Sequence, residues 1–448
     1  MADRPPAPSS DSAVDLADAL TQFRRLVDPA MIDELQPCGP ASVYTPWVTV
    51  WLLVYQRLHR NATLQTAVAE FARIADTHSS NKRVREGTLS SNTGTYSRAR
   101  SRLLAPVAEA VADHVFTSIV AATPPSLGGR RVFALDGTTV SLASNDRLRE
   151  HWPPGANQHG PNTWPICQLV SAHELESGAA VRAELGAMYG SEADSEVAMA
   201  KLLFPRIPAH SLLMADRNFG VFGFVHAAVA AGHDVLVRLV QSRFEALKRS
   251  AEEAGPRRWR LRWTPTKANR RTDPNLPADA AVSVWLHEFV GFSGQTLWVA
   301  TTAEASVEAL AELYAKRWSI ETDIRQLKTT LECDALRGQS PEMIRKEWAM
   351  AMVAYNLVVQ VRRLAAERAK VPPRSLSFSG VWSLVKIVFL SPNPWTAEEW
   401  QKRFEWVLRG ALQRKLPKRP GRSFKREVIP RRRKFPDRPR KKPEDSGK

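Results

Sequence analysis

The spacing of hydrophobic residues changes near residue 130 and predicts two kinds of structure. Over residues 12–122, apolar residues recur at the three- and four-residue intervals of amphipathic helices, with polar links between them. Over residues 130–240, strand-like apolar runs such as VFALDG and LLMADR alternate with helical segments. That alternation predicts an α/β fold, in which helices cover the faces of a mixed sheet.

Two further changes in the pattern divide the rest of the chain. Residues 241–304 interrupt the α/β pattern with β-like runs rich in Trp and Arg, and helical spacing returns after residue 305. We therefore expect a disordered tail at 1–11, a helical N-terminal domain at 12–122, a core formed by 130–240 and 305–410, a β-rich insertion at 241–304, and a basic disordered tail at 411–448.

The segment 314–328, YAKRWSIETDIRQLK, combines two stripes on one expected helix. Its Leu and Ile residues form an apolar stripe, which is typical of a helix seated on a core. At the helical step of about 100° per residue, four polar residues fall within about 60° of one another and form a second stripe. This stripe lies about 80° from the apolar one. The four polar residues are Tyr314, Arg317, Glu321 and Lys328. Spacing alone leaves open an ordinary solvated face, in which Arg and Lys balance Glu.

Two further acids lie at the ends of apolar strands. Asp136 ends the run VFALD and precedes a glycine, and Asp216 ends the run LLMAD. An aspartate at such a place commonly caps a turn or the next helix, so each one alone is also compatible with a structural role. With Glu321 on the expected helix, the chain offers three carboxylates that the fold could bring together.

Positive charge is concentrated at the C-terminus. The whole chain has a net charge of +17, and residues 411–448 hold 16 basic against 4 acidic residues. A segment of this composition cannot bury enough apolar surface to fold alone. Its expected partner is a polyanion, either nucleic acid or an anionic membrane surface. The alternative is that the tail only keeps the protein in solution.

The cysteines and apolar runs exclude several classes of protein. Cys38, Cys167 and Cys333 are far apart and form no CxxC pair, which excludes a zinc ribbon and indicates a reducing compartment. The most apolar run, residues 43–55, is too short to cross a bilayer, so we expect a buried helix there. The N-terminus lacks the apolar run of a signal peptide. We therefore expect a cytoplasmic protein.

Taken together, these residues resemble the DDE transposases of the bacterial insertion-sequence-four family, which have a ribonuclease-H-like core. In that family the third acid lies in a signature of Tyr, two residues, Arg, three residues, Glu, six residues and Lys. Residues 314–328 match this signature at every spacing, and LDGTT, ADRNFG and EWAMAMVAYNL are similar to the family's usual wording. The resemblance covers roughly residues 20–400, including the β-rich insertion and the helical N-terminal domain. It implies that Asp136, Asp216 and Glu321 are the three catalytic acids.

The resemblance implies a metal-dependent transposase that cuts at the ends of its own mobile element and joins them to target DNA. The three carboxylates would hold two Mg²⁺ ions, with Mn²⁺ as a substitute, to activate the nucleophile and neutralise the leaving oxygen. Double-stranded DNA is the expected partner and no membrane is involved. Both element ends must be held together, so we expect a homodimer in the DNA complex.

Several basic residues are expected to contact the DNA backbone. Arg317 has the forked guanidinium that clamps a phosphate, Lys328 offers a point charge, and Tyr314 offers a hydroxyl. Simple pairing with Glu321 is the alternative for this group. The same contact is expected of Arg217, which adjoins Asp216, and of three arginines at the start of one helix, for which ordinary surface charge is the alternative: Arg98, Arg100 and Arg102.

The insertion is rich in tryptophan. The resemblance implies an aromatic residue in this region on which a displaced base stacks. We expect this residue to be Trp298, because TLWVATT comes closest along the chain to the helix with Glu321. A tryptophan in a small β unit more often belongs to the core, and that alternative applies to all four candidates: Trp259, Trp263, Trp285 and Trp298.

Two other functions share part of this pattern. A ribonuclease-H-like nuclease that cuts DNA without joining it would use the same acids. An inactive DNA-binding relic of a transposase would not need them, and the presence of Asp136, Asp216 and Glu321 argues against it.

Overall fold

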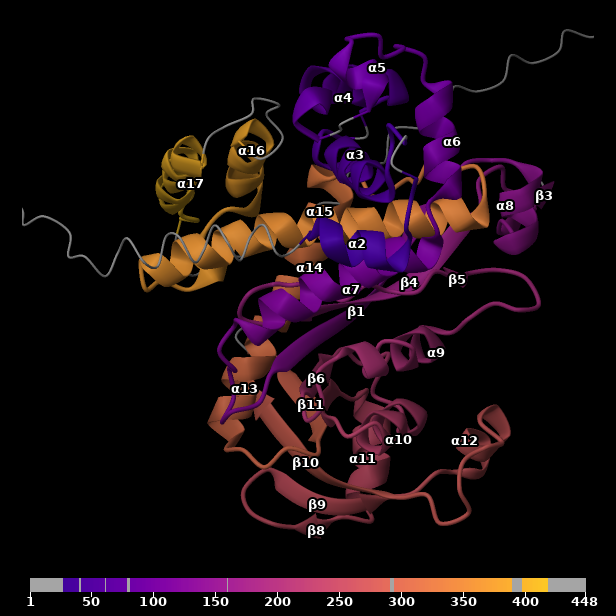
Figure 1. The fold of residues 1–448 in the computed structure, drawn as a ribbon. Coiled ribbons are helices and arrows are strands. Elements are labelled where there is room, and N and C mark those ends of the chain that lie inside the picture. Colours follow the sequence, from indigo (N-terminus) through magenta and orange to yellow (C-terminus); the bar gives the residue numbers. More distant parts are fainter. Residues whose placement is uncertain are drawn as a thin grey trace, which may run out of the picture. The chain divides into compact units, whose positions relative to one another are not determined.

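Nine strands form one mixed sheet in the part of the chain that the structure describes (Figure 1). This computed structural model describes residues 27–39, 42–60, 62–78, 81–158, 160–290, 294–388 and 397–417. The strands of the sheet are β1 (Val132–Ser141), β4 (Ile166–Glu174), β5 (Gly186–Ala187), β6 (Leu212–Ala215), β7 (Asp234–Arg238), β8 (Glu252–Glu253), β9 (Arg258–Trp263), β10 (Val282–Val290) and β11 (Thr296–Thr301). A separate pair consists of β2 (Ala156–Asn157) and β3 (Gly160–Pro161).

The order of the sheet is β5-β4-β1-β6-β7-β11-β10-β9-β8. β1 pairs antiparallel with β4 on one side and parallel with β6 on the other, and β6 pairs parallel with β7. A meander on one side of the first strand and parallel crossover strands on the other side form the ribonuclease-H-like core that the sequence predicts. The predicted α/β class, with a mixed sheet between helices, is confirmed.

The central strands leave the buried core where their acids lie. Val132, Phe133, Ala134 and Leu135 are fully buried, whereas β1 is half-buried from Asp136 to Thr139. The four residues of β6 are also fully buried, and half-buried Asp216 follows them. Continuous apolar runs are typical of parallel strands covered on both faces, which is why these segments contain no polar residue before the aspartate.

The strands of residues 241–304 extend the core sheet. β11 pairs antiparallel with β7, and β10 and β9 continue outward from it. This region also contains two helices, α11 (Gln241–Lys248) and α12 (Lys267–Thr272), which the sequence pattern did not indicate. The expected β-rich insertion is thus an outward continuation of the sheet. Its boundary at residue 241 stays a prediction.

Helices account for most of the described residues before β1. Thr45 caps the helix Pro46–Leu58 by accepting a hydrogen bond from the Val48 amide, and that helix is largely buried, as the sequence predicts. Among the described residues, no single helix has the length and apolar composition to cross a membrane, although two consecutive helices that meet at 76° have them as a pair. The helices are α2 (Pro29–Leu35), α3 (Pro46–Leu58), α4 (Leu64–His78), α5 (Lys82–Arg85), α6 (Gly94–Arg102) and α7 (Ala105–Ala121).

One long helix, α15 (Pro341–Arg368), holds the helices before β1 against the sheet region (Figure 1). It packs against α3 and α7, and its C-terminal part contacts two later helices, α16 (Phe378–Val388) and α17 (Ala397–Leu412). Most of its side chains are buried, including charged ones. The remaining helices after β1 are α8 (Asp146–His151), α9 (Glu196–Lys201), α10 (Phe222–Ala230), α13 (Val307–Ala315) and α14 (Ser319–Arg325), with short 3₁₀ turns at Phe204–Arg206, Lys316–Trp318 and Pro373–Ser375.

The prediction of one uniform α-helix over residues 314–328 is wrong, because the segment changes helix type twice. A 3₁₀ turn, Lys316–Trp318, separates α13 from α14, and a π turn, Gln326–Thr330, follows α14. Each change of helix type alters the rotation per residue, so the single polar stripe calculated for a uniform α-helix does not hold. π turns of this kind occur frequently at functional sites.

The described residues up to Lys415 belong to one compact unit. The tail expected at 1–11 lies outside the described residues, as do residues 418–448 of the expected basic tail. The domain boundaries drawn from the sequence therefore stay predictions.

A buried ion pair joins α3 to α15, and it gives a prediction for stability. Glu347 accepts hydrogen bonds from Arg57 Nη2 and from the backbone amides of Arg337 and Gly338, at 3.0 and 2.7 Å for the amides. We expect Glu347→Ala to lower the free energy of unfolding by about 3–5 kcal/mol, because it leaves a buried guanidinium unpaired. Urea unfolding measures this. The control Glu398→Ala removes an exposed partner of Lys402 and should change nothing measurable; equal losses in both variants would contradict the prediction.

Candidate active site

Parallel pairing places Asp136 and Asp216 beside each other. Leu135 of β1 is in register with Ala215 of β6, so the two aspartates follow at the same level of two neighbouring strands. Each carboxylate also accepts a local backbone hydrogen bond. Asp136 Oδ1 accepts from the Gly137 amide at 3.0 Å, and Asp216 Oδ1 accepts from the Asn218 amide at 2.9 Å. Asp216 directly follows β6, whereas Asp136 lies within β1, which continues to Ser141, so the expectation that Asp136 ends a strand is wrong.

Glu321 approaches the same place from α14. Burial raises the pKa of Asp136 to about 6; Arg317 opposes this rise, and the negative charges of Asp216 and Glu321 add to it. The four side chains therefore lie within electrostatic reach of one another. The structure brings together the three acids that the sequence singles out.

The three acids offer the ligand atoms that a divalent cation prefers, but their side chains are not arranged around one point. Among the described residues, no group of three or more His, Cys, Asp and Glu side chains is arranged so that it could hold a metal ion. The donor set nevertheless consists of carboxylate oxygens, which Mg²⁺ and Mn²⁺ prefer. Burial raises the pKa of Asp136 and the charges of Asp216 and Glu321 add to the rise, and a bound cation would oppose both effects. The donor chemistry therefore fits a divalent cation, and the arrangement of the three side chains does not yet enclose one.

Arg317 occupies the space between the acids and two aromatic rings. Its Nη2 lies 3.5 Å from Glu321 Oε1, and its Cζ lies 6.0 Å from the Tyr314 ring centroid and 5.0 Å from that of Trp318. This is the simple pairing with Glu321 that the sequence left open. Tyr314 is buried, and burial raises its pKa to about 12, so its hydroxyl keeps its proton.

Lys328 reaches β1 next to the acids. Its Nζ donates to Thr138 Oγ1 at 3.0 Å, two residues beyond Asp136 along the strand. Burial lowers the pKa of Lys328, and the charge of Asp334 opposes that shift. Asp136 and Thr138 are two residues apart in the strand, so the lysine lies on the same face of the sheet as Asp136. It does so although it belongs to the π turn.

Comparisons with known proteins agree with this arrangement. A family model described as the transposase DDE domain matches residues 127–357, just over half of the chain, including Asp136, Asp216 and Glu321. The chain belongs to the transposase DDE domain family. The resemblance to the insertion-sequence-four family is confirmed, and so is the interpretation of the chain as a DDE transposase.

One curated relative illustrates this membership. The transposase is 26% identical over 337 residues to "Transposase InsG for insertion sequence element IS4" of Escherichia coli strain K12, and the match covers 71% of this chain and 72% of that relative. Among solved structures, piggyBac transposase in a synaptic complex with hairpin DNA is similar with a TM-score of 0.39 and 8% identity, over 92% of this chain and 86% of that one. A TM-score of this size does not establish a common fold.

The other expected DNA-contacting residues of the transposase lie in different settings. Arg217 is exposed in the turn after Asp216. Trp298 is half-buried on β11 and packs against the core, with its ring centroid 6.4 Å from that of Phe244. The three arginines of the helix before α7 lie on α6, where two are exposed and one is half-buried: Arg98, Arg102 and Arg100.

Two residues near the acids of the transposase escaped sequence reasoning. Trp318 is 60% exposed beside Arg317, although it lies inside the quoted signature segment. Glu196 of α9 packs so closely on β1 that a Cβ at Gly137 would collide with its carboxylate, and its Oε2 lies 3.4 Å from Asn218 Nδ2. Only the exposure of Trp318 and the close approach at Gly137 reveal these residues, and neither is visible in the sequence.

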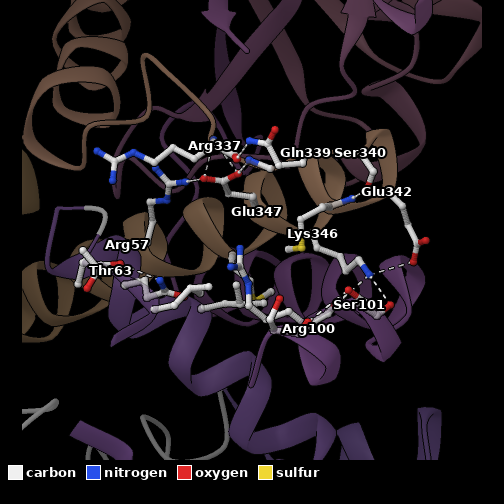
Figure 2. Close-up of a pocket in the computed structure, with 18 of the residues that line it drawn as sticks. Arg57, Thr63, Arg100, Ser101, Arg337, Gln339, Ser340, Glu342, Lys346 and Glu347 are labelled. Atoms are coloured by element: carbon white, nitrogen blue, oxygen red, sulfur yellow. Dashed lines mark hydrogen bonds and ion pairs between the residues drawn. The ribbon is translucent and has the colours of Figure 1, made fainter. Parts of the chain in front are cut away.

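A cavity of about 620 Å³ lies apart from the acids, none of which lines it (Figure 2). α3, α6 and α15 contribute to its walls, including Arg57, Arg100 and Lys346. Lys346 Nζ donates to the carbonyl oxygens of Arg100 and Leu103, at 3.1 and 2.6 Å. Arg100 Nε is buried in this cavity wall without a hydrogen-bond partner. Glu342 and Glu347 also line this basic cavity and pair with Lys346 and Arg57, so part of its positive charge is balanced within the wall.

The raised pKa of Asp136 predicts how stability depends on pH without metal. Between pH 3.8 and about 6, folded Asp136 keeps a proton that the unfolded chain has released, so the stability from this group is lost as pH rises through 6. We expect Asp136→Asn to remove this loss and to raise the unfolding temperature in chelator at pH 7. Thermal unfolding from pH 4 to pH 7 measures it, with exposed Glu312→Gln as control. Identical pH profiles for wild type and Asp136→Asn would refute the shift.

Proposed function

We propose that this DDE transposase cuts DNA at the ends of its own mobile element and joins those ends to target DNA, with Asp136, Asp216 and Glu321 around the reacting phosphate. The observation that carries the proposal is the register of β1 and β6, in which Asp136 and Asp216 lie at the same level of neighbouring strands, with Glu321 of α14 near enough for its charge to act on Asp136. Acids that lie close together in a half-buried place favour a cation-dependent site over a structural role.

Each side chain has a distinct task in this proposal. When bound, a pair of divalent cations, Mg²⁺ or Mn²⁺, would supply an activated nucleophile and neutralise the leaving oxygen. The three carboxylates hold that charge from within β1, after the end of β6 and on α14. Lys328, held beside β1 by Thr138, meets a phosphate oxygen of the bound strand. Arg317 exchanges its contact with Glu321 for a phosphate, which its fork binds with two hydrogen bonds.

DNA would contact the protein beyond the acids as well. Arg217 is exposed beside Asp216, and Arg98 and Arg102 are exposed on α6, so these cations can reach backbone phosphates. For stacking on a displaced base, Trp298 is the residue proposed from the sequence, and exposed Trp318 adds an aromatic surface closer to Glu321 along the chain. Two element ends are joined in one reaction, so the active assembly on DNA would be a homodimer. A cytoplasmic location, expected from the cysteines, stays a prediction.

The first test replaces the acids singly. Asp136→Asn, Asp216→Asn and Glu321→Gln should each slow cleavage of a DNA end by about a thousandfold, the order of loss for a group that stabilises transition-state charge. DNA affinity should be retained. The substrate is the inverted repeat identified in the DNA flanking the gene, and Glu312→Gln on α13 is the control. Wild-type cleavage by any of the three variants would remove that acid from the mechanism.

Pre-cut ends separate joining from cutting. A duplex with a free 3′-hydroxyl at the element end needs no cleavage, so a transposase should join it to plasmid DNA in the presence of Mg²⁺. A nuclease of the same fold would cut intact ends and leave this substrate unjoined. That second outcome would replace transposition by the alternative function.

A separate prediction concerns α6 and the basic cavity. Arg98→Ala and Arg100→Ala should each weaken duplex binding and reduce the slope of log affinity against log salt by about 0.9, if each contacts one phosphate. Fluorescence anisotropy at several salt concentrations measures the slope. Arg409→Ala removes an exposed arginine of α17 and should leave the slope unchanged. If Arg98→Ala and Arg100→Ala also left the salt dependence unchanged, DNA would not bind at α6.

A further inference from the structure

The helix that carries Glu321 is too short to orient itself. α14 has 7 residues, and a 3₁₀ turn and a π turn bound it on either side. A helix of this length is not stable alone, and its position depends on tertiary packing. Ile320 and Ile324 supply part of that packing in an apolar cluster beneath the sheet. Apolar contacts are non-directional, so they leave the rotation of Glu321 toward Asp136 poorly specified.

The opposite side of α14 carries a buried carboxylate. Asp323 follows Glu321 by two residues, which is a rotation of about 200° around an α-helix. Its side chain is 4% exposed, and Arg374 Nη1 lies 3.0 Å from Oδ1 and 2.8 Å from Oδ2. Burying a carboxylate is costly unless it is paired in good geometry. This ion pair therefore fixes the side of α14 that faces away from the acids.

Arg374 connects α14 to the strand next to β1. It lies in the turn Pro373–Ser375, and it donates from Nη2 to the Glu174 carbonyl at 3.1 Å and from Nε to the Leu175 carbonyl. Glu174 is the last residue of β4, and β4 is hydrogen-bonded to β1, with Ser171 opposite Asp136. One guanidinium thus links the helix of Glu321 to the sheet that positions Asp136.

The turn after β4 is shaped to receive this guanidinium. Gly178 has φ +83°, and a Cβ there would collide with Arg362 Nη2 and lie 3.5 Å from Arg374 Cζ. Arg362 donates to the Ser177 carbonyl at 2.7 Å, so two arginines from separate segments pack onto one turn. His173 of β4 adds a contact, with Nδ1 3.7 Å from Asp323 Oδ2. Such a close fit leaves little freedom for Arg374 or for the carboxylate that it holds.

We propose that Arg374 is a positioning residue that, through Asp323 and the carbonyls at the end of β4, sets the place of Glu321 relative to Asp136. The inference rests on the proposed role of Glu321. Lysine cannot replace Arg374, because a single ammonium lacks the fork that reaches one carboxylate and two carbonyls in different directions. A purely structural ion pair is the competing explanation, and it predicts lost stability without a specific change at the acids.

The test uses variants that separate stability from position. Arg374→Met breaks the link, and the double variant Asp323→Leu with Arg374→Met replaces the buried pair by apolar side chains, a change that is often neutral for stability. Arg363→Met is the matched control. Arg363 is also a buried arginine, but it bonds Gln360, Glu367 and the Ala122 carbonyl and contacts no residue of α14 in these bonds. Thermal unfolding of the full-length chains ranks their stability.

Two readouts report on the site. Electron paramagnetic resonance measures Mn²⁺ affinity of the metal-free chains, and cleavage kinetics separate kcat from KM for DNA. We expect Arg374→Met and the double variant to lower Mn²⁺ affinity and kcat by about 10- to 100-fold, the usual effect of losing a residue that orients a ligand, with KM for DNA unchanged. Amide hydrogen exchange across residues 319–325 should be faster. Arg363→Met should leave these readouts at wild-type values.

A double variant that melts like wild type and also binds Mn²⁺ and cleaves like wild type would overturn the inference. So would an Arg363→Met variant that loses as much Mn²⁺ affinity as Arg374→Met at equal stability. Glu321→Gln, measured in parallel, distinguishes the two levels of proposal. If Glu321→Gln loses Mn²⁺ affinity and cleavage while the double variant keeps both, only the role of Arg374 fails. If Glu321→Gln keeps both, the proposed function itself fails.

Discussion

Repulsion between carboxylates is the constraint around which the core is arranged. Three acids can share a half-buried site only if the backbone holds them there against their mutual charge. Burial raises the pKa of Asp136, and the charges of Asp216 and Glu321 add to that rise. Two of the acids, Asp136 and Asp216, are positioned by the hydrogen-bonded register of the parallel strands β1 and β6. Glu321 has no such ladder. Its helix needs other fixation, which explains why a charged network occupies the interior beneath α14.

That network draws on residues far apart in the chain. Asp323, Arg374 and His173 meet from a helix, a turn and a strand, and they are buried together. A comparable arrangement fixes the helices before β1, where Lys346 and Glu347 of α15 bond to α6 and α3. In both places a directional polar contact specifies the geometry that surrounding apolar packing would leave loose. The long helix α15 therefore positions the helices around it through polar contacts and also contributes apolar side chains to the core.

Much of the site was predictable from local sequence, because its acids follow signals of short range. Buried apolar runs that lead into an aspartate single out Asp136 and Asp216, and the spacing of residues 314–328 singles out Glu321, but only the family resemblance makes them the three catalytic acids. The irregular turns on both sides of α14 were not predictable, since helical periodicity assumes one rotation per residue. Arg374 and Glu196 were missed for a different reason. Their roles depend on contacts with residues far away in sequence, and single-sequence patterns carry no signal for such pairs.

The pairing of residues 241–304 shows a similar limit. Strand-like runs indicated β structure correctly, but the alternation of residues does not specify which strand they join, and β11 adds to β7. This addition has a consequence for the sheet as a whole. Both of its outermost strands, β5 and β8, are two residues long, and β8 is a pair of exposed glutamates. Both borders are short and one is charged, so they offer a poor template on which a neighbouring molecule could continue the sheet.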